Sequence, residues 1–316
     1  MEYNVPALTT LKRGDIRHRI WRYRMIYLMM LPGLLFFLIY RYLPMFGIII
    51  AFKKVSPAAT PMEMITAPWV GLTHFRNFFN SFYFWRIFEN TLRISLYGII
   101  FGFPAPIMFA LLLNELRFTR FKKIVQTISY MPHFLSMVIV AALVQIVFSP
   151  SGGIVNEVIK FFGGEPIYFL ATPQYFRSIL VGTGIWQGLG WGSILYIAAI
   201  TGIDPELYDA ACIDGANRWR RMWHITLPGM SFIITLNLIL NLGYILDAGF
   251  ERVLLLYTPV VYGVGDIIDT YVFRVGLIQF NYSLTTAVGL FKSVVSLILI
   301  IGADRFSKKI GQRGIW

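Results

Sequence analysis

The side chains that most often carry catalysis or bind metal ions are few in this chain and lie far apart. The sequence contains four histidines and one cysteine, at His18, His74, His133, His224 and Cys212. No two of them have the spacing of an HExxH or CxxC motif. The sequence also lacks a GxxxxGK[ST] loop for nucleotide phosphates. We therefore expect no catalytic residue, no metal site and no cofactor bound by this chain, so any energy source must lie on another protein.

A second group of side chains could bind a ligand because these residues are polar or amphipathic yet lie inside long apolar runs. Such residues are costly in lipid and usually face a cavity or a partner helix. Three of them occur at i, i+4 and i+7, which places them on one face of a helix. The alternative that they only form hydrogen bonds between helices stays open. The group is Trp186, Gln187, Asn237, Asn241, Tyr244 and Lys292.

Lys292 is the sharpest case in this group, because it lies near the middle of an apolar run. An uncompensated lysine there would cost several kcal/mol. We expect its ammonium group to have a carboxylate partner, to lie in water, or to meet an acidic substrate.

The composition sets the fold class. Of the 316 residues, 57% are hydrophobic and 14% are charged, whereas soluble domains have roughly 25% charged residues. Apolar stretches of 18 or more residues recur, and each can cross a bilayer as a helix. The net charge of +12 does not indicate nucleic acid, because the basic residues lie beside apolar runs rather than in a stripe with aromatics. We predict an all-α polytopic membrane protein.

Six transmembrane helices are predicted, at about 25–50, 91–113, 128–148, 178–200, 230–246 and 284–301. With both termini in the cytoplasm, the cytoplasmic segments hold 17 Lys and Arg residues and the external segments hold 8. This asymmetry follows the positive-inside rule. The chain then divides into a cytoplasmic tail (1–24), the first transmembrane helix (25–50), an external loop with an interfacial helix (51–90), a five-helix core (91–303) that includes a cytoplasmic loop (204–228), and a second cytoplasmic tail (304–316).

Two segments have unusual local chemistry. Glycines at 182, 184, 188, 190 and 192 occur inside the fourth predicted span, where they could loosen the helix or bring another backbone close. The polar stretch 204–230 predicts a helix capped by Asp204, with Pro205 in its first turn and Gly215 in a left-handed conformation at its end. A second helix is predicted over 216–225, and Pro228 is expected to interrupt the backbone before the next span.

The sequence YDAACIDGANRWRRMWHITLP, at 208–228, resembles the cytoplasmic EAA loop of bacterial ABC importer permeases. Asp209, Ala210 and Ala211 correspond to the EAA residues, with Asp in place of the first Glu, and Gly215 has the expected offset. The motif closes with Ile225, Leu227 and Pro228. The stretches IYRYLPMFGIIIAF, DIIDTYVFRVGL and AVGLFKS further resemble the carbohydrate-uptake branch, in particular permeases for oligosaccharides and polysaccharides.

The resemblance implies a type I ABC importer permease fold in the bacterial inner membrane. It also implies several partners: a second, different permease subunit, two cytosolic ATPase subunits that bind ATP and Mg, and an extracytoplasmic solute-binding protein. The loop would couple ATPase closure to pore opening through Asp209, Ala210, Ala211, Asp214, Gly215, Ala216 and Arg218. The polar membrane residues would then line a sugar pathway, because aromatic faces and amide groups suit sugars, and Lys292 would suit an acidic oligosaccharide.

Two other classes of function are less well supported by the residues. A membrane enzyme would need paired carboxylates, HExxH or an activated serine within a span, and none is evident. A secondary transporter would need an internal repeat with an interrupted helix in each half, and none is evident by inspection.

Overall fold

The computed structural model describes residues 21–57 and 59–309, and the regular structure in this part of the chain is helical. An isolated bridge between Lys53 and Trp69 is its one β-type backbone pairing. A helix satisfies its own backbone hydrogen bonds, which matters because lipid offers no partner to a free N–H or C=O group. The predicted all-α class is confirmed for the described residues. Most of the two predicted tails, 1–24 and 304–316, lies outside them.

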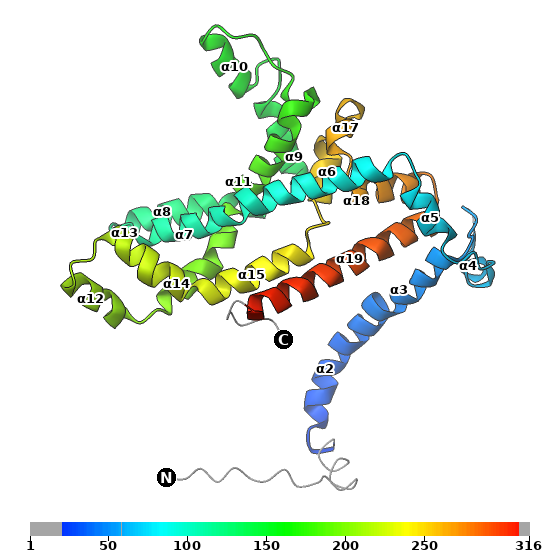
Figure 1. The fold of residues 1–316 in the computed structure, drawn as a ribbon, viewed down its shortest axis with the longest axis horizontal. Coiled ribbons are helices and arrows are strands. Elements are labelled where there is room, and N and C mark those ends of the chain that lie inside the picture. Colours follow the sequence, from blue (N-terminus) through cyan, green and yellow to red (C-terminus); the bar gives the residue numbers. More distant parts are fainter. Residues whose placement is uncertain (1–20, 58, 310–316) are drawn as a thin grey trace. The chain divides into compact units, whose positions relative to one another are not determined.

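Backbone contacts divide the chain into two units, residues 1–50 and residues 51–316. In the first unit the described elements are α2 (Arg24–Phe37), the π-helical η1 (Leu38–Tyr42), α3 (Leu43–Met45) and most of the 3-10 segment η2 (Phe46–Phe52) (Figure 1). The helical stretch Arg24–Phe52 is long and apolar enough to cross a membrane, and few of its side chains are buried. This stretch contains the first predicted span, 25–50.

The second unit contains the remaining helices, many of which lie side by side in Figure 1. In chain order they are α4 (Pro61–Thr66), α5 (Thr73–Phe79), α6 (Phe84–Tyr97), η3 (Gly98–Gly102), α7 (Pro104–Asn114), α8 (Thr119–Tyr130), η4 (Met131–Phe134), α9 (Met137–Val147), α10 (Ile154–Phe161), η5 (Phe169–Ala171), α11 (Pro173–Thr201), α12 (Pro205–Ile213), α13 (Arg218–Arg221), η6 (Met222–Thr226), α14 (Leu227–Gly229), α15 (Ser231–Gly243), α16 (Phe250–Leu256), η7 (Pro259–Val261), α17 (Tyr262–Gly265), α18 (Ile268–Val272), η8 (Phe273–Ile278) and α19 (Tyr282–Lys309).

The count of six spans is not confirmed. Three described helical stretches are long and apolar enough to cross a membrane, at Arg24–Phe52, Phe84–Asn114 and Tyr282–Lys309. Two bent pairs raise the number to five if each pair is one span, Thr119–Phe134 with Met137–Val147 and Arg218–Gly229 with Ser231–Gly243. Helix α11 has sufficient length but is less apolar, because glycines, Gln187 and two tryptophans occupy its middle.

The first bend has a local cause, and close packing accompanies the second. Between η4 and α9 the chain turns by 105° at the extended residue Leu135, and the hydroxyl of Ser136 then caps α9 by accepting from the Ile139 N–H. Between α14 and α15 the turn is 60°. There Gly229 lies so close to the Ile203 side chain that a Cβ atom would overlap it.

Aromatic residues of the predicted external loop 51–90 divide between the core and the surface. Phe78 and Phe84 are buried, and Phe78 packs against the rings of Tyr271 and Phe291. Phe82 is 86% exposed. Part of the aromatic density that suggested an interfacial helix therefore serves core packing.

The glycines of α11 bring other segments close, which is one of the two effects predicted for them. The other predicted effect, a loosened helix, is wrong. The helix runs unbroken from Pro173 to Thr201. Gly190 lies directly against the backbone carbonyl of Ser129, where a Cβ atom would overlap, and Gly192 faces the ring of Pro106. By contrast, a Cβ atom at Gly182 would meet nothing within 4 Å.

A buried polar cluster joins α6, α11 and the α17–α18 turn. The fully buried Asp266 carboxylate accepts from both terminal nitrogens of Arg274, at 3.2 and 2.7 Å, and from the Thr270 hydroxyl at 2.8 Å. Asn90 donates to the Asp266 carbonyl at 3.1 Å and accepts from Arg177 at 2.7 Å. Burial acts to lower the pKa of Arg274, but the hydrogen bonds and charge of Asp266 outweigh it and raise that pKa.

The glycine contacts predict opposite effects for two identical substitutions. Gly190→Ala should destabilise the protein by about 1–3 kcal/mol, because the new methyl group must displace the Ser129 backbone. Gly182→Ala should stabilise it by up to about 1 kcal/mol, because alanine is the better helix former and the space is open. Thermal unfolding of the detergent-solubilised variants measures both, and an equal effect of the two substitutions would contradict the close contact.

Candidate functional site

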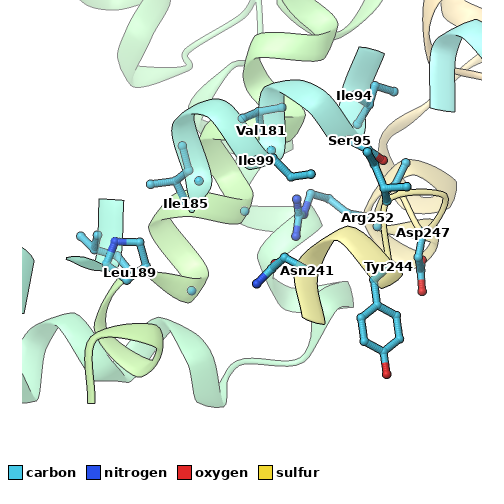
Figure 2. A pocket seen from close by; sticks show the side chains of 18 residues that line it. Ile94, Ser95, Ile99, Val181, Ile185, Leu189, Asn241, Tyr244, Asp247 and Arg252 are labelled. Atoms are coloured by element: carbon cyan, nitrogen blue, oxygen red, sulfur yellow. The ribbon is translucent and has the colours of Figure 1, made fainter. Parts of the chain in front are cut away.

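A cavity of about 350 Å³ lies where α6, η3 and α11 meet the chain segment that links α15 to α16. Figure 2 shows that its walls come from segments far apart in the sequence. Ser95 of α6 and Ile99 of η3 belong to one wall, and Gly184 and Ile185 of α11 belong to another. We call this space the Arg252 cavity, after the one arginine among its lining residues.

Two of the three polar residues predicted on one face of the fifth span line this cavity. Asn241 donates to the carbonyl of Asn237 at 2.8 Å, and Tyr244 follows the end of α15 with 70% of its surface exposed. Asn237 is not among the lining residues and donates to the carbonyl of Ile233 at 3.0 Å. The structure thus brings together Asn241 and Tyr244 but leaves Asn237 within its own helix.

Trp186 and Gln187 do not reach the Arg252 cavity. Trp186 lines an apolar crevice of about 680 Å³ between α9 and α11, beside Phe148 and Phe169. Gln187 makes a long hydrogen bond of 3.4 Å to the carbonyl of Leu135. Consecutive residues of a helix point about 100° apart, so these neighbours face different surroundings.

The ammonium group of Lys292 has a carboxylate partner, which is one of the three environments predicted for it. Its ammonium nitrogen lies 2.7 Å from each oxygen of Asp269, and each of the two side chains is 21% exposed. The pair lines a cavity of about 500 Å³ that also includes Asp247, Phe250 and Tyr282. Asp247 lines the Arg252 cavity as well. The sequence alone could not pair residues 23 positions apart on different elements.

Arg252 is the functional candidate that the sequence analysis missed. It belongs to the short helix α16, and its Nη1 atom donates to the Leu180 carbonyl at 3.1 Å. Its Nε atom is buried and has no hydrogen-bond partner. The signal in the sequence is a single arginine among the apolar residues of FERVLLL, which is weak because external loops often contain an arginine.

The polar segment 204–229 has the predicted helix, glycine, helix form. Asp204 caps α12 by accepting from the Glu206 N–H at 3.0 Å, and Pro205 lies in the first turn. Gly215 has a φ of 71°, a conformation that other residues adopt only with strain. The Tyr208 hydroxyl lies 3.0 Å from the Thr226 hydroxyl, which joins the two helices.

The boundaries of the second helix in this segment differ from the prediction. It begins at Arg218 rather than 216, because Asn217 caps it by accepting from the Arg220 N–H at 2.9 Å. It also continues to Gly229 through the π-helical η6. Pro228 does not interrupt it, because this proline lies in the first turn of α14.

The tip of this segment is open to a partner. A Cβ atom at Gly215 would meet nothing within 4 Å. Asp209, Ala210 and Asp214 are exposed, whereas Ala211 and Ala216 are partly buried. Ile213 is 88% exposed.

The described residues contain no group of three or more His, Cys, Asp or Glu side chains placed to hold a metal ion. The side chains that line the cavities offer hydrogen bonds, charge and aromatic faces.

The chain matches a protein family over residues 102–312, the binding-protein-dependent transport system inner membrane component. It is 45% identical over 305 residues to the polygalacturonan/rhamnogalacturonan transport system permease protein YteP of Bacillus subtilis (strain 168). This alignment covers 96% of the chain and 94% of the relative.

Solved structures agree with this similarity. A subunit of a bacterial ABC transporter involved in the import of the acidic polysaccharide alginate superposes with a TM-score of 0.87 at 42% identity, over 93% of this chain and 99% of that one. A chain of the alginate transporter in complex with alginate pentasaccharide-bound periplasmic protein gives 0.86 at 41% identity, over 94% of this chain and 99% of that one.

The Lys292–Asp269 pair supports a test that separates stability from ligand binding. Lys292→Met should destabilise the protein by roughly 1–3 kcal/mol, because it leaves a largely buried carboxylate without its partner. Adding Asp269→Asn should recover most of this loss. Thermal unfolding measures stability, and sugar uptake by the reconstituted protein measures function. A double variant that is stable but inactive would assign the pair to the pathway, whereas a single Lys292→Met variant with normal stability and uptake would contradict both roles.

Proposed function

Because this chain belongs to the family of binding-protein-dependent transport system inner membrane components, we propose that it is the permease subunit of an ATP-driven importer of acidic oligosaccharides. The observation that carries this proposal is the exposed helix, glycine, helix segment 204–229 between α11 and α15. In a chain without a phosphate-binding loop, such a segment is the place where a separate ATPase connects.

The form of the segment supports a coupling role. Small side chains at Ala210 and Ala211 allow close approach of a groove in a partner, while Asp209 and Arg218 offer charges at the rim. The caps at Asp204 and Asn217 and the left-handed Gly215 hold the two short helices in a fixed orientation. Asp214 and Ala216 flank the glycine and complete the proposed contact surface.

The segment continues into the membrane helices on both sides. Helix α11 ends at Thr201, three residues before the cap Asp204, and α14 leads into α15 across the 60° bend. In the proposed topology the polar segment and both termini are cytoplasmic. The three long helical stretches, α11 and the predicted spans 128–148 and 230–246 then give six spans in all. A displacement of the segment would then move two walls of the Arg252 cavity.

The proposed complex contains partners that this chain lacks. They are a second, different permease subunit, two cytosolic ATPase subunits that hold ATP and Mg, and an extracytoplasmic binding protein that delivers the sugar. The similarity to a transporter solved together with a sugar-loaded periplasmic protein supports the last of these. Membrane lipid surrounds the spans of the complex.

The acidic substrate class rests on relatives and on charge. One similar protein is named for a polygalacturonan/rhamnogalacturonan transport system, and another belongs to a transporter involved in the import of the acidic polysaccharide alginate. The cavities carry amide, aromatic and cationic side chains, among them Asn241, Tyr244 and Lys292. We assign these three to the sugar pathway. Trp186, Gln187 and Asn237 remain weaker candidates, because the contacts of Gln187 and Asn237 fit helix packing.

A substitution at the tip of the segment tests coupling. Gly215→Val should leave the protein inserted but reduce ATPase co-purification and sugar-stimulated hydrolysis at least about tenfold, which corresponds to a coupling free energy of 1.4 kcal/mol. The cause is that valine opposes the left-handed backbone. The measurement uses the assembled complex with its sugar-loaded binding protein.

Gly71→Val is the matched control, because Gly71 also has a positive φ, of 58°, and an open surrounding. It should keep the ATPase bound. Normal hydrolysis and uptake in the Gly215→Val variant would refute the coupling role. A wild-type complex that imports sugar without any ATPase would instead indicate a secondary transporter.

A further inference from the structure

The guanidinium group of Arg252 lies in the cavity with most of its donors unused. A guanidinium group has five N–H donors. The Nη1 atom donates to the Leu180 carbonyl at 3.1 Å, and the buried Nε atom has no hydrogen-bond partner. Figure 2 shows its guanidinium group and the amide group of Asn241 directed toward the middle of the view, whereas the Tyr244 ring extends away. A cationic fork with free donors therefore lines a cavity of ligand size.

The other partly buried cations in the described part of the chain have hydrogen-bond or ion-pair partners. Lys53 and Arg177 use uncharged oxygens: Lys53 donates to the Ile65 carbonyl, and Arg177 donates to the Val264 carbonyl and the Asn90 side chain. Arg274 forms a two-pronged pair with Asp266, and Lys292 forms one with Asp269. In the described part of the chain Arg252 takes part in no ion pair. A largely buried cation without a carboxylate is costly, and such a cost is typical of groups whose counter-charge arrives with a ligand.

The surroundings of Arg252 are shaped around it. Gly184 lies so close that a Cβ atom there would overlap the guanidinium group, and a Cβ atom on Gly249 would be 3.7 Å from Nη1. The carboxylate of Asp247 lines the same cavity but forms no ion pair with Arg252. The volume of about 350 Å³ lies within the range of small-molecule sites.

We propose that Arg252 is the residue that selects for a carboxylate group on the transported sugar. This inference rests on the proposed function and assigns the charge recognition to one side chain. The guanidinium fork matches the two oxygens of a carboxylate, and the Asn241 amide lies where it can bind a sugar hydroxyl. Lys292 lines the neighbouring cavity of the same pathway, but it is the weaker candidate for selecting a carboxylate because Asp269 already pairs with it.

The test measures binding directly, because uptake would also report the selectivity of the binding protein. The assembled complex of both permeases and the ATPases, in lipid nanodiscs without the binding protein, is dialysed against radiolabelled trigalacturonate or its carboxyl-reduced trisaccharide. The wild-type complex should prefer the acidic sugar. Arg252→Gln should weaken trigalacturonate binding at least about tenfold and leave binding of the neutral sugar unchanged, and Arg252→Lys should retain part of the preference.

Arg93→Gln is the matched control, since Arg93 pairs with Glu89 on the surface of α6 and lines none of the cavities described above. It should bind both sugars as the wild type does. Thermal unfolding supplies a second readout, in which Arg252→Gln should be at least as stable as the wild type because an unpaired buried charge has been removed.

Equal binding of the two sugars by the wild-type complex, or an equal loss of both in Arg252→Gln, would overturn the assignment. So would a lower unfolding temperature of Arg252→Gln together with unchanged selectivity, which is the result of a structural arginine. Failure of the proposed function is a different result, in which the wild-type complex with its binding protein shows no ATP-driven uptake of any oligosaccharide.

Discussion

The carboxylate of Asp266 is the buried charge on which the arrangement of the second unit depends. It is fully buried and tied to Arg274 and Thr270, while its own backbone carbonyl accepts from Asn90, which in turn accepts from Arg177. Breaking such a network leaves an unpaired charge in a low dielectric, at a cost of roughly 3–5 kcal/mol. The α17–α18 turn is therefore fixed against α6 and the first turns of α11, and these two helices form walls of the Arg252 cavity.

Helix α11 connects the three features that matter for function. Arg177, near its start, joins the Asp266 cluster, Gly184 in its middle accommodates Arg252, and its end at Thr201 leads into the polar segment. The helix has no break over 29 residues, although glycines occupy its centre. Some of these glycines allow close packing of neighbours such as the Ser129 backbone. A rigid element of this length can transmit a displacement at one end to the cavity, provided that the packed helices have two discrete arrangements.

Local chemistry explains what the sequence could predict. Asp204, Pro205 and Gly215 specify a cap, a first turn and a left-handed end within a few residues, so the form of the polar segment follows from neighbours in the chain. The partner of Lys292 and the unpaired state of Arg252 depend on residues that come together only in the folded chain. Asn217, by contrast, is a local cap, and it sets a helix start two residues after the start predicted from the Gly215 turn. The π-helical turns had no signal in the pattern of apolar residues.

Cys212 allows the most direct test of the claim that the polar segment docks an ATPase. It is the only cysteine of the chain and is exposed on α12. Its alkylation by a membrane-impermeant maleimide can be followed on this subunit in inverted membrane vesicles, with and without the ATPase subunits. We expect ready labelling of the free permease and strong protection in the assembled complex. Equal labelling rates in the two preparations, or labelling only from the opposite side of the membrane, would contradict it.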